Sequence, residues 1–136
     1  MYPLEALSLR RKRRSLLSRA RGDVLEIGAG TGVNLGYYDA STVASITMSD
    51  LSVGERLRER AASFAGGGGV TGSGRSDSRR PGSGETPVHL SEADAMNLPF
   101  PDDSFDTVVM TLVFCSVPDQ AAGFTEIRRV LRPGGQ

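Results

Sequence analysis

The sequence has a single cysteine, Cys115, among its 136 residues, so no disulfide can form within the chain. The lack of a disulfide framework is typical of proteins from a reducing compartment, and we expect a cytoplasmic protein. No apolar run approaches the roughly 20 residues that cross a bilayer. The first twenty residues also lack the apolar stretch of roughly 7–15 residues that a secretory signal requires.

An excess of charge of either sign is missing as well, because 16 basic and 16 acidic residues cancel. No overall field attracts nucleic acid, and we expect no nucleic-acid partner. Basic residues gather instead in the N-terminal segment, residues 1–22, which we predict to form a helix over 4–21. Its basic run at 10–14 is typical of a solvated helix face; a nuclear or organellar address and a contact with anionic lipid are the alternatives.

Strand-like and helix-like segments alternate over residues 23–136. This order predicts one α/β domain with a doubly wound, Rossmann-like parallel sheet. Predicted strands lie at 23–27, 43–49, 88–90 and 105–114, and predicted helices at 52–64 and 120–131. The run 105–114 is apolar without alternation, which predicts a central strand buried on both faces. The second helix is predicted to bury a stripe made by Phe124, Ile127, Val130 and Leu131.

Residues 65–87 interrupt this pattern with a segment rich in glycine, serine and arginine. Such a composition buries too little apolar surface to offset the entropy of ordering, so we predict a disordered insertion. Arginine- and glycine-rich loops also contact RNA, and this is the alternative. The segment has no aromatic residue on which a base would stack, which favours the disordered surface insertion.

Glycines recur between residues 26 and 32, directly after the first predicted strand. Glycine permits positive φ and lets a ligand approach bare backbone, and a following helix would add amide donors. A dinucleotide fingerprint requires glycine or alanine at the sixth position from Gly28, where the sequence has Val33. Glu26 also places a carboxylate where a pyrophosphate would lie, which is unfavourable. S-adenosylmethionine carries an ammonium and a sulfonium and no phosphate, so Glu26 favours that ligand over a nicotinamide dinucleotide.

Two acidic residues follow the next two predicted strands. Asp50 lies twenty residues after Gly30, a spacing typical of the acid that accepts hydrogen bonds from ribose hydroxyls. The alternative for Asp50 is a turn residue that precedes a helix. Asp94 and Ala95 lie in the loop after the third strand, within reach of an adenine amino group.

Three segments in this order resemble the motifs of class I S-adenosylmethionine-dependent methyltransferases. Residues 24–32 resemble their first motif, 94–106 their adenine loop, and 126–135 the helix and turn before their fifth strand. Residues 31–35 and 111–117 are similar to the methyltransferase-like 7 group, and through it to the methyltransferases of ubiquinone, menaquinone and phosphatidylethanolamine synthesis (type 11 methyltransferase domain). The resemblance implies methyl transfer to a small-molecule acceptor: a lipid, a quinone precursor or a thiol.

The resemblance also implies which residues bind the cofactor S-adenosylmethionine. Glu26, Gly28 and Gly30 would hold its methionine end, and Asp50 its ribose. Asp94 and Ala95 would contact adenine, and Thr111 and Leu112 would line the methyl-transfer site. The full expected set is Glu26, Gly28, Ala29, Gly30, Thr31, Asp50, Leu51, Asp94, Ala95, Thr111 and Leu112. No catalytic base and no metal site is identified, and His89 and Cys115 are interpreted as structural.

The family's fifth strand would begin where the sequence reaches Gln136. We therefore expect a methyltransferase domain truncated after about four strands, whose open sheet edge favours self-association. Two alternatives to an active methyltransferase remain at this point: a non-catalytic fragment that binds cofactor or a protein partner, and a nicotinamide-dependent oxidoreductase.

Overall fold

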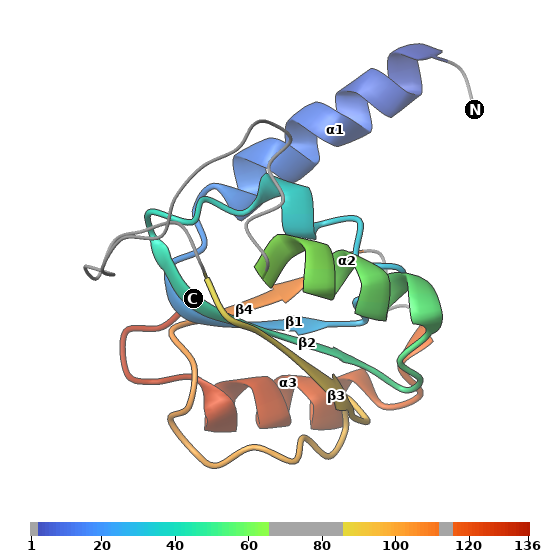
Figure 1. The fold of residues 1–136 in the computed structure, drawn as a ribbon. Coiled ribbons are helices and arrows are strands. Elements are labelled where there is room, and N and C mark those ends of the chain that lie inside the picture. Colours follow the sequence, from blue (N-terminus) through green and yellow to red (C-terminus); the bar gives the residue numbers. More distant parts are fainter. Residues whose placement is uncertain (1–2, 66–85, 112–115) are drawn as a thin grey trace.

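The computed structural model describes residues 3–65, 86–111 and 116–136. Within them the chain forms a parallel sheet and flanking helices (Figure 1). In chain order the elements are α1 (Pro3–Leu17), β1 (Gly22–Ile27), the 3-10 turn η1 (Leu35–Tyr37), β2 (Val43–Asp50), α2 (Glu55–Ala65), β3 (Val88–Glu92), β4 (Thr107–Met110) and α3 (Gln120–Val130). The predicted helix at the N-terminus thus ends at Leu17, earlier than expected.

The sheet has four strands in the order β3-β2-β1-β4. Each neighbouring pair is parallel: β1 lies between β2 and β4, and β3 pairs with the outer side of β2. Because the strands are parallel, their carboxyl ends meet at one edge of the sheet, where ligands bind in open α/β sheets. The predicted Rossmann-like, doubly wound architecture is confirmed.

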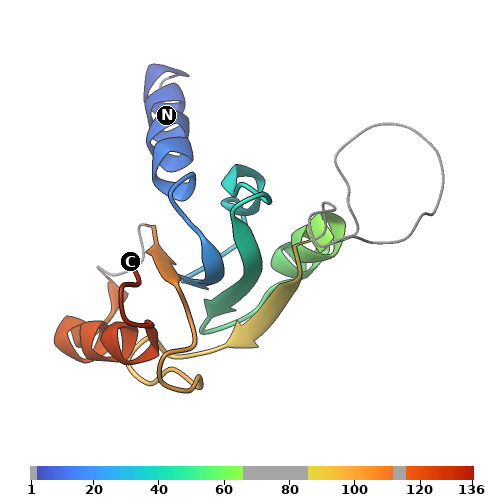
Figure 2. The same cartoon turned by 90° about the vertical axis from the view of Figure 1, so that its left-hand side faces the viewer.

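Helices cover both faces of this sheet. Figures 1 and 2 show α3 on one face and α1, η1 and α2 on the other. The buried side chains form two clusters that match these layers, because successive residues of a strand point to opposite faces. Val24, Leu35, Tyr38 and Leu57 belong to the cluster beneath α1, η1 and α2. Leu25, Ile27, Ile127 and Val130 belong to the cluster beneath α3.

Two predictions about buried faces are wrong in detail. Residues 107–110 alternate between buried and half-buried, so the described part of the fourth strand is not buried on both faces. The reason is its position: within the described chain, β1 is the only named strand that pairs with it. On α3 the side chain of Phe124 is 51% exposed. The buried stripe runs instead through Gly123, Ile127 and Val130, at spacings of four and three residues.

A third difference lies between β1 and β2. The expected helix after the glycine turn is only the short turn η1, whose 3-10 hydrogen bonds end at Tyr38 in extended backbone. Gly32 (φ 79°) just before the turn has a backbone conformation that an α-helix excludes. A long helix N-terminus therefore does not supply amide donors to the ligand edge here.

The predicted disordered insertion falls almost wholly outside the described residues, and for 66–85 it stays a prediction. Its two ends are ordered: Ala65 is the last residue of α2, and Thr86 is buried. The Thr86 hydroxyl donates to the carbonyl of Val43 at 3.3 Å. In the described part of the chain, no helix combines the length and apolar character needed to cross a membrane.

Charged side chains tie the amino ends of β1 and β4 together. The Arg132 guanidinium lies 3.0 Å from the Asp23 carboxylate and 2.8 Å from that of Asp106. Asp106 also accepts a hydrogen bond from the Asp23 amide at 2.8 Å. Gly22 (φ +65°) passes so close that a Cβ there would lie 2.1 Å from Asp106 Oδ2. This edge is on the opposite side of the sheet from the ligand edge, and it fixes the pairing of the two strands.

Candidate functional site

The glycine turn after β1 is fastened to the end of β2 by backbone hydrogen bonds. The amides of Gly28 and Ala29 donate to the carbonyl of Ser49 at 2.8 and 3.0 Å. Gly30 has φ +58°, and a Cβ built on it meets no atom within 4 Å. Its amide donates to Asp50 Oδ2 at 2.7 Å. The turn is thus held rigidly while its outer surface at Gly30 stays open to a ligand.

Glu26 is buried beneath this turn, with 1% of its surface exposed. Its carboxylate accepts hydrogen bonds from the side-chain amide of Asn34 and, at 3.0 Å, from the hydroxyl of Tyr38. The same Asn34 amide donates to Thr111 Oγ1 at 2.9 Å. Asn34 and Tyr38 flank η1, so this turn positions both donors around the carboxylate. The contact with Thr111 links the ends of β1 and β4.

Burial disfavours the ionised form of Glu26 and raises the pKa of its carboxyl to about 7, even though its hydrogen bonds with Asn34 and Tyr38 oppose the shift. The Tyr38 hydroxyl has a raised pKa, because it is buried and lies against that carboxylate. Asn34 Oδ1 is buried and has no hydrogen-bond partner among the described residues. The site therefore contains a buried carboxyl with a pKa near neutrality and a buried amide oxygen without a hydrogen-bond partner among the described residues. A cationic hydrogen-bond donor would satisfy both groups.

The other two acidic residues of the predicted site, Asp50 and Asp94, line a pocket on the other side of the turn. Ala93 N donates to the Asp50 carbonyl at 2.8 Å, which brings the ends of β2 and β3 together. The pocket is mostly apolar, with carboxylates at its rim. Its lining residues are Ile27, Gly28, Asp50, Leu51, Ala93, Asp94, Ala95, Ser116, Val117 and Pro118. A flat heterocycle between apolar side chains, with its polar atoms toward the acidic rim, suits this lining.

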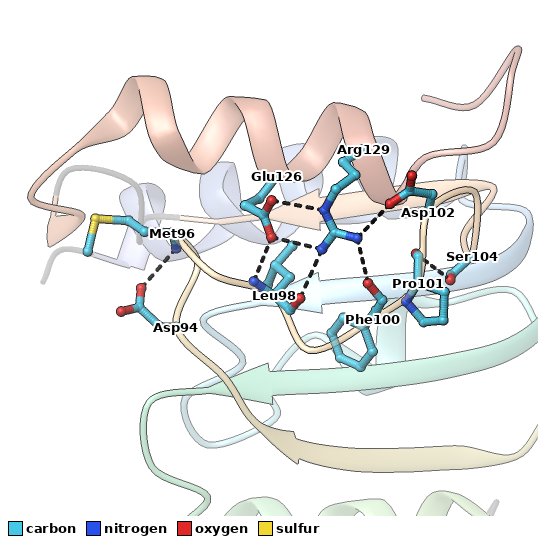
Figure 3. A network of polar contacts seen from close by, with 9 residues as sticks. All are labelled: Asp94, Met96, Leu98, Phe100, Pro101, Asp102, Ser104, Glu126 and Arg129. Carbon is cyan, nitrogen blue, oxygen red and sulfur yellow. Dashed lines mark hydrogen bonds and ion pairs between the residues drawn. The ribbon is translucent and has the colours of Figure 1, made fainter.

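The loop that carries Asp94 is clamped to α3 by Arg129 (Figure 3). The Arg129 guanidinium binds Glu126 through two hydrogen bonds, at 2.9 and 2.8 Å. It also donates to the carbonyls of Leu98 and Phe100 at 2.9 and 2.7 Å, and to Asp102 at 2.9 Å. Glu126 in turn accepts from the Leu98 amide at 2.8 Å. These contacts hold the pKa of the Glu126 carboxyl below its usual value and raise the pKa of Arg129.

The structure gathers most of the predicted site residues. Gly28, Asp50, Leu51, Asp94 and Ala95 line one pocket. Glu26 and Thr111 lie in the hydrogen-bonded cluster on the other side of the turn. Ala29 and Gly30 belong to the turn between the two groups, whereas Leu112 lies outside the described residues. Thr31 is exposed, and its carbonyl accepts from Arg60 at 3.1 Å.

Asn34, Tyr38 and the three pocket residues at 116–118 were not predicted to belong to the site. Asn34 lies in the segment 31–35 that resembles the methyltransferase-like 7 group, but nothing local to it in the sequence indicates a contact with Glu26. His89 is exposed on β3 and lines none of the grooves described here, while Cys115 lies outside the described residues. Among the residues that the structure describes, no group of three potential metal ligands is found.

A family model described as a methyltransferase domain matches residues 25–136, from the middle of β1 onward. The chain belongs to the methyltransferase domain family. The expected class I methyltransferase fold is therefore confirmed. Solved structures with this fold include an S-adenosylmethionine-dependent methyltransferase from Mesorhizobium loti, at 25% identity with a TM-score of 0.62.

Two curated relatives illustrate the range of the methyltransferase domain. A phosphatidylethanolamine N-methyltransferase of Cereibacter sphaeroides is 33% identical over 132 residues, covering 95% of this chain and 55% of the relative. A demethylmenaquinone methyltransferase of Clavibacter sepedonicus is 36% identical over 115 residues, covering 83% of this chain and 38% of the relative. The chain spans between about a third and a half of the length of such relatives.

The fold of the YcgJ protein from Bacillus subtilis is similar as well. It superposes with a TM-score of 0.64 at 28% identity, covering 96% of this chain and 48% of the solved one. The donor set found here fits the cofactor of this family. The buried Glu26 carboxylate suits the ammonium of that ligand, the carboxylates of Asp50 and Asp94 suit its hydroxyl and amino donors, and the open space at Gly30 leaves room for it.

Proposed function

We propose that this chain binds S-adenosylmethionine at the carboxyl ends of β1, β2 and β3 and serves methyl transfer to a small-molecule acceptor. The observation that carries the proposal is the buried Glu26 cluster beneath an open glycine turn. A carboxylate held by Asn34 and Tyr38 suits an ammonium group and opposes a phosphate. Family membership and the carboxylates at Asp50 and Asp94 support the same ligand.

Each side of the turn has its own part in this proposal. Glu26 and the unpaired Asn34 Oδ1 accept hydrogen bonds from the ammonium of the methionine end. Asp50 uses Oδ2 for the Gly30 amide and offers its second oxygen to ribose hydroxyls. Ile27, Leu51 and Val117 enclose the adenine, and Asp94 accepts from the adenine amino group. Arg129 holds the Asp94 loop in place without touching the ligand.

The bound cofactor supplies a methyl group activated by its positive sulfur. Glu26 and Asp50 would hold the methionine end and the ribose of the cofactor, so that this methyl group would face the acceptor from a fixed position. The chain's contribution is alignment and exclusion of water, which supply a large part of the rate of methyl transfer. Thr111 borders the place where the acceptor enters, at the end of β4.

The acceptor class is inferred from the relatives and from the sequence resemblance. One relative is named for phosphatidylethanolamine and another for demethylmenaquinone. Both acceptors join a polar reacting group to a large apolar body. We infer a lipid-like or quinone-like small molecule here; a thiol, which the methyltransferase-like 7 resemblance implies, is the other acceptor of this class.

Calorimetric titration of the purified chain with S-adenosylmethionine tests the cofactor site, with NADH as the competing ligand class. We expect saturable binding of S-adenosylmethionine and none of NADH. Asp50→Asn keeps an acceptor for the Gly30 amide and should still weaken binding. Asp39→Ala, which removes an exposed carboxylate outside the pocket, should leave affinity unchanged.

The outcomes separate the proposal from its alternatives. A folded chain that ignores S-adenosylmethionine overturns the cofactor assignment, and NADH binding would point to an oxidoreductase. Binding without methyl transfer to quinol, phospholipid or thiol acceptors would favour the non-catalytic reading. Circular dichroism of every variant verifies that lost binding is not lost folding.

A further inference from the structure

A second groove lies on the same sheet face as Glu26, between α1 and the carboxyl end of β4. It has a volume of about 220 Å³. The two strand-end residues that border it are Met110 and Thr111, and Thr111 also contacts Asn34 of the Glu26 cluster. The groove is therefore connected to the proposed methionine end of the cofactor site by a single shared residue.

The α1 side of this groove combines apolar and cationic side chains. Leu9 and Leu16 border it and are 39% and 50% exposed, and Lys12 and Arg13 stand between them. Neither cation forms an ion pair with another residue of the described ranges, in contrast to Arg129 and Arg132. Within the described ranges, no carboxylate therefore lies within ion-pair distance of either cation.

The helix is fixed in this position at its carboxyl-terminal end. Leu17 is fully buried in the cluster beneath α1, and Ala20 just beyond the helix is 2% exposed. The hydroxyl of Thr42 donates to the Ala20 carbonyl at 3.0 Å. Arg13 lies near enough to Glu26 for its charge to lower the pKa of that carboxyl, although burial outweighs this effect. An anion bound at Arg13 would therefore lie beside the cofactor site.

We propose that this groove binds the acceptor, and that the acceptor is an amphiphile with an anionic oxygen group. The anion pairs with Lys12 and Arg13, and its apolar part lies against Leu9, Leu16 and Met110. The inference rests on the proposed function and specifies its acceptor. Guanidinium and ammonium groups are the protein's strong partners for phosphate esters and phenolates. An apolar lining alone would admit a neutral hydrocarbon and would not require two cations.

The same helix offers a matched control. Arg11 and Arg14 are exposed and lie outside the groove lining, so they carry equal charge on another side of α1. The pair Lys12→Gln with Arg13→Gln removes the groove cations, and Arg11→Gln with Arg14→Gln removes the same charge elsewhere. The pair Lys12→Arg with Arg13→Lys keeps both charges and tests whether charge, not packing, matters.

Octyl phosphate is the probe, titrated calorimetrically below its aggregation range into the full chain. Inorganic phosphate tests the head alone, and octyl glucoside tests the tail alone. Phosphatidylglycerol vesicles test whether the chain binds the anionic group in a bilayer or only on a free molecule. We expect octyl phosphate to bind at least about tenfold more tightly than either partial probe, because both the charged pair and the apolar lining contribute.

The proposal is supported if replacing Lys12 and Arg13 by glutamine lowers the affinity for octyl phosphate by about tenfold or more. The variant that keeps both charges should bind as tightly as wild type, and so should the glutamine variant at Arg11 and Arg14. Vesicle binding with the same selectivity identifies a lipid as the source, and its absence identifies a free acceptor. The proposal is refuted if both glutamine variants lose the same affinity for octyl phosphate, or if inorganic phosphate binds as tightly as octyl phosphate. Either result would mean that a basic helix attracts anions without a specific groove.

Titration with S-adenosylmethionine in the same variants separates this inference from the proposed function. Cofactor binding that persists while octyl phosphate fails to bind refutes the acceptor groove alone. Octyl phosphate binding by a folded chain that ignores the cofactor refutes the cofactor site and leaves the groove. Circular dichroism establishes the folded state of each variant.

Discussion

Replacing Glu26 by glutamine isolates the energetic consequence of burying this carboxyl. In the unfolded chain the carboxyl has its ordinary pKa near 4.5, and in the folded chain burial raises that pKa to about 7. Between these values the folded state binds more protons than the unfolded state, so raising the pH favours unfolding. The glutamine variant has no such proton to lose.

The size of the effect follows from the two pKa values. Each pH unit between them is worth about 1.4 kcal/mol, so ionising Glu26 in the folded chain lowers the free energy of unfolding by on the order of 3 kcal/mol. The wild-type chain and Glu26→Gln should differ little near the lower pKa. Above the upper pKa the glutamine variant should be the more stable of the two without ligand.

Urea unfolding of both proteins from about pH 5 to about pH 8 measures this gap, which should widen by roughly 2–3 kcal/mol across the range. Other carboxyls are common to both proteins and cancel in the difference. Glu59→Gln, an exposed change on α2, is the control and should give a curve parallel to wild type. If the free energies of unfolding of wild type and Glu26→Gln change in parallel with pH, the raised pKa of the buried Glu26 carboxyl is refuted.

Four further expectations follow from the same contacts. Affinity for S-adenosylmethionine should fall as the pH drops below 7, by up to about tenfold per pH unit as Glu26 gains a proton, and Glu26→Gln should flatten this dependence in calorimetry. Gly22→Ala should lower the free energy of unfolding by about 2 kcal/mol or more, because positive φ and the Asp106 carboxylate oppose a Cβ, whereas Gly36→Ala has open space and should change it little in urea titration. Arg129→Met removes the bonds to the Leu98 and Phe100 carbonyls, so it should lower stability and speed amide exchange over residues 94–102, while Arg128→Met does not. The outer side of β4, which Gln136 covers in part by bonding the Asp106 carbonyl and the Val108 amide, should produce concentration-dependent self-association in sedimentation velocity, and a monomer at every concentration would contradict this.

The sheet and the position of its ligand edge could be predicted because they depend on short-range patterns. Apolar runs separated by turn residues indicate buried strands, and the rule for parallel sheets places Gly28, Asp50 and Asp94 at one edge. All three line the same pocket in the structure. The predicted class of cofactor depended on two residues at a turn shared by many nucleotide folds: Val33, which breaks the dinucleotide pattern, and the carboxylate of Glu26.

The Glu26 cluster could not be predicted, because its partners lie in irregular backbone. Asn34 and Tyr38 flank a single 3-10 turn, in a segment where a longer helix was expected. Their side chains reach Glu26 only because that turn folds back over the end of β1. Arg129 is similar: its pairing with Glu126 fits helical spacing, but its bonds to the Leu98 and Phe100 carbonyls depend on a loop that lies 31 and 29 residues earlier in the chain.

The burial of Glu26 makes cofactor binding and stability work against each other. Without ligand, the ionised carboxyl is held by two neutral donors in a site that favours its protonated form. A cationic ligand reverses this preference, because a nearby positive charge favours the ionised form. Ionisation near neutral pH therefore weakens the free chain, and in the proposed site it would prepare Glu26 for an ammonium group. Burying a carboxyl at this position costs stability, and the proposed cofactor site gives a reason for that cost.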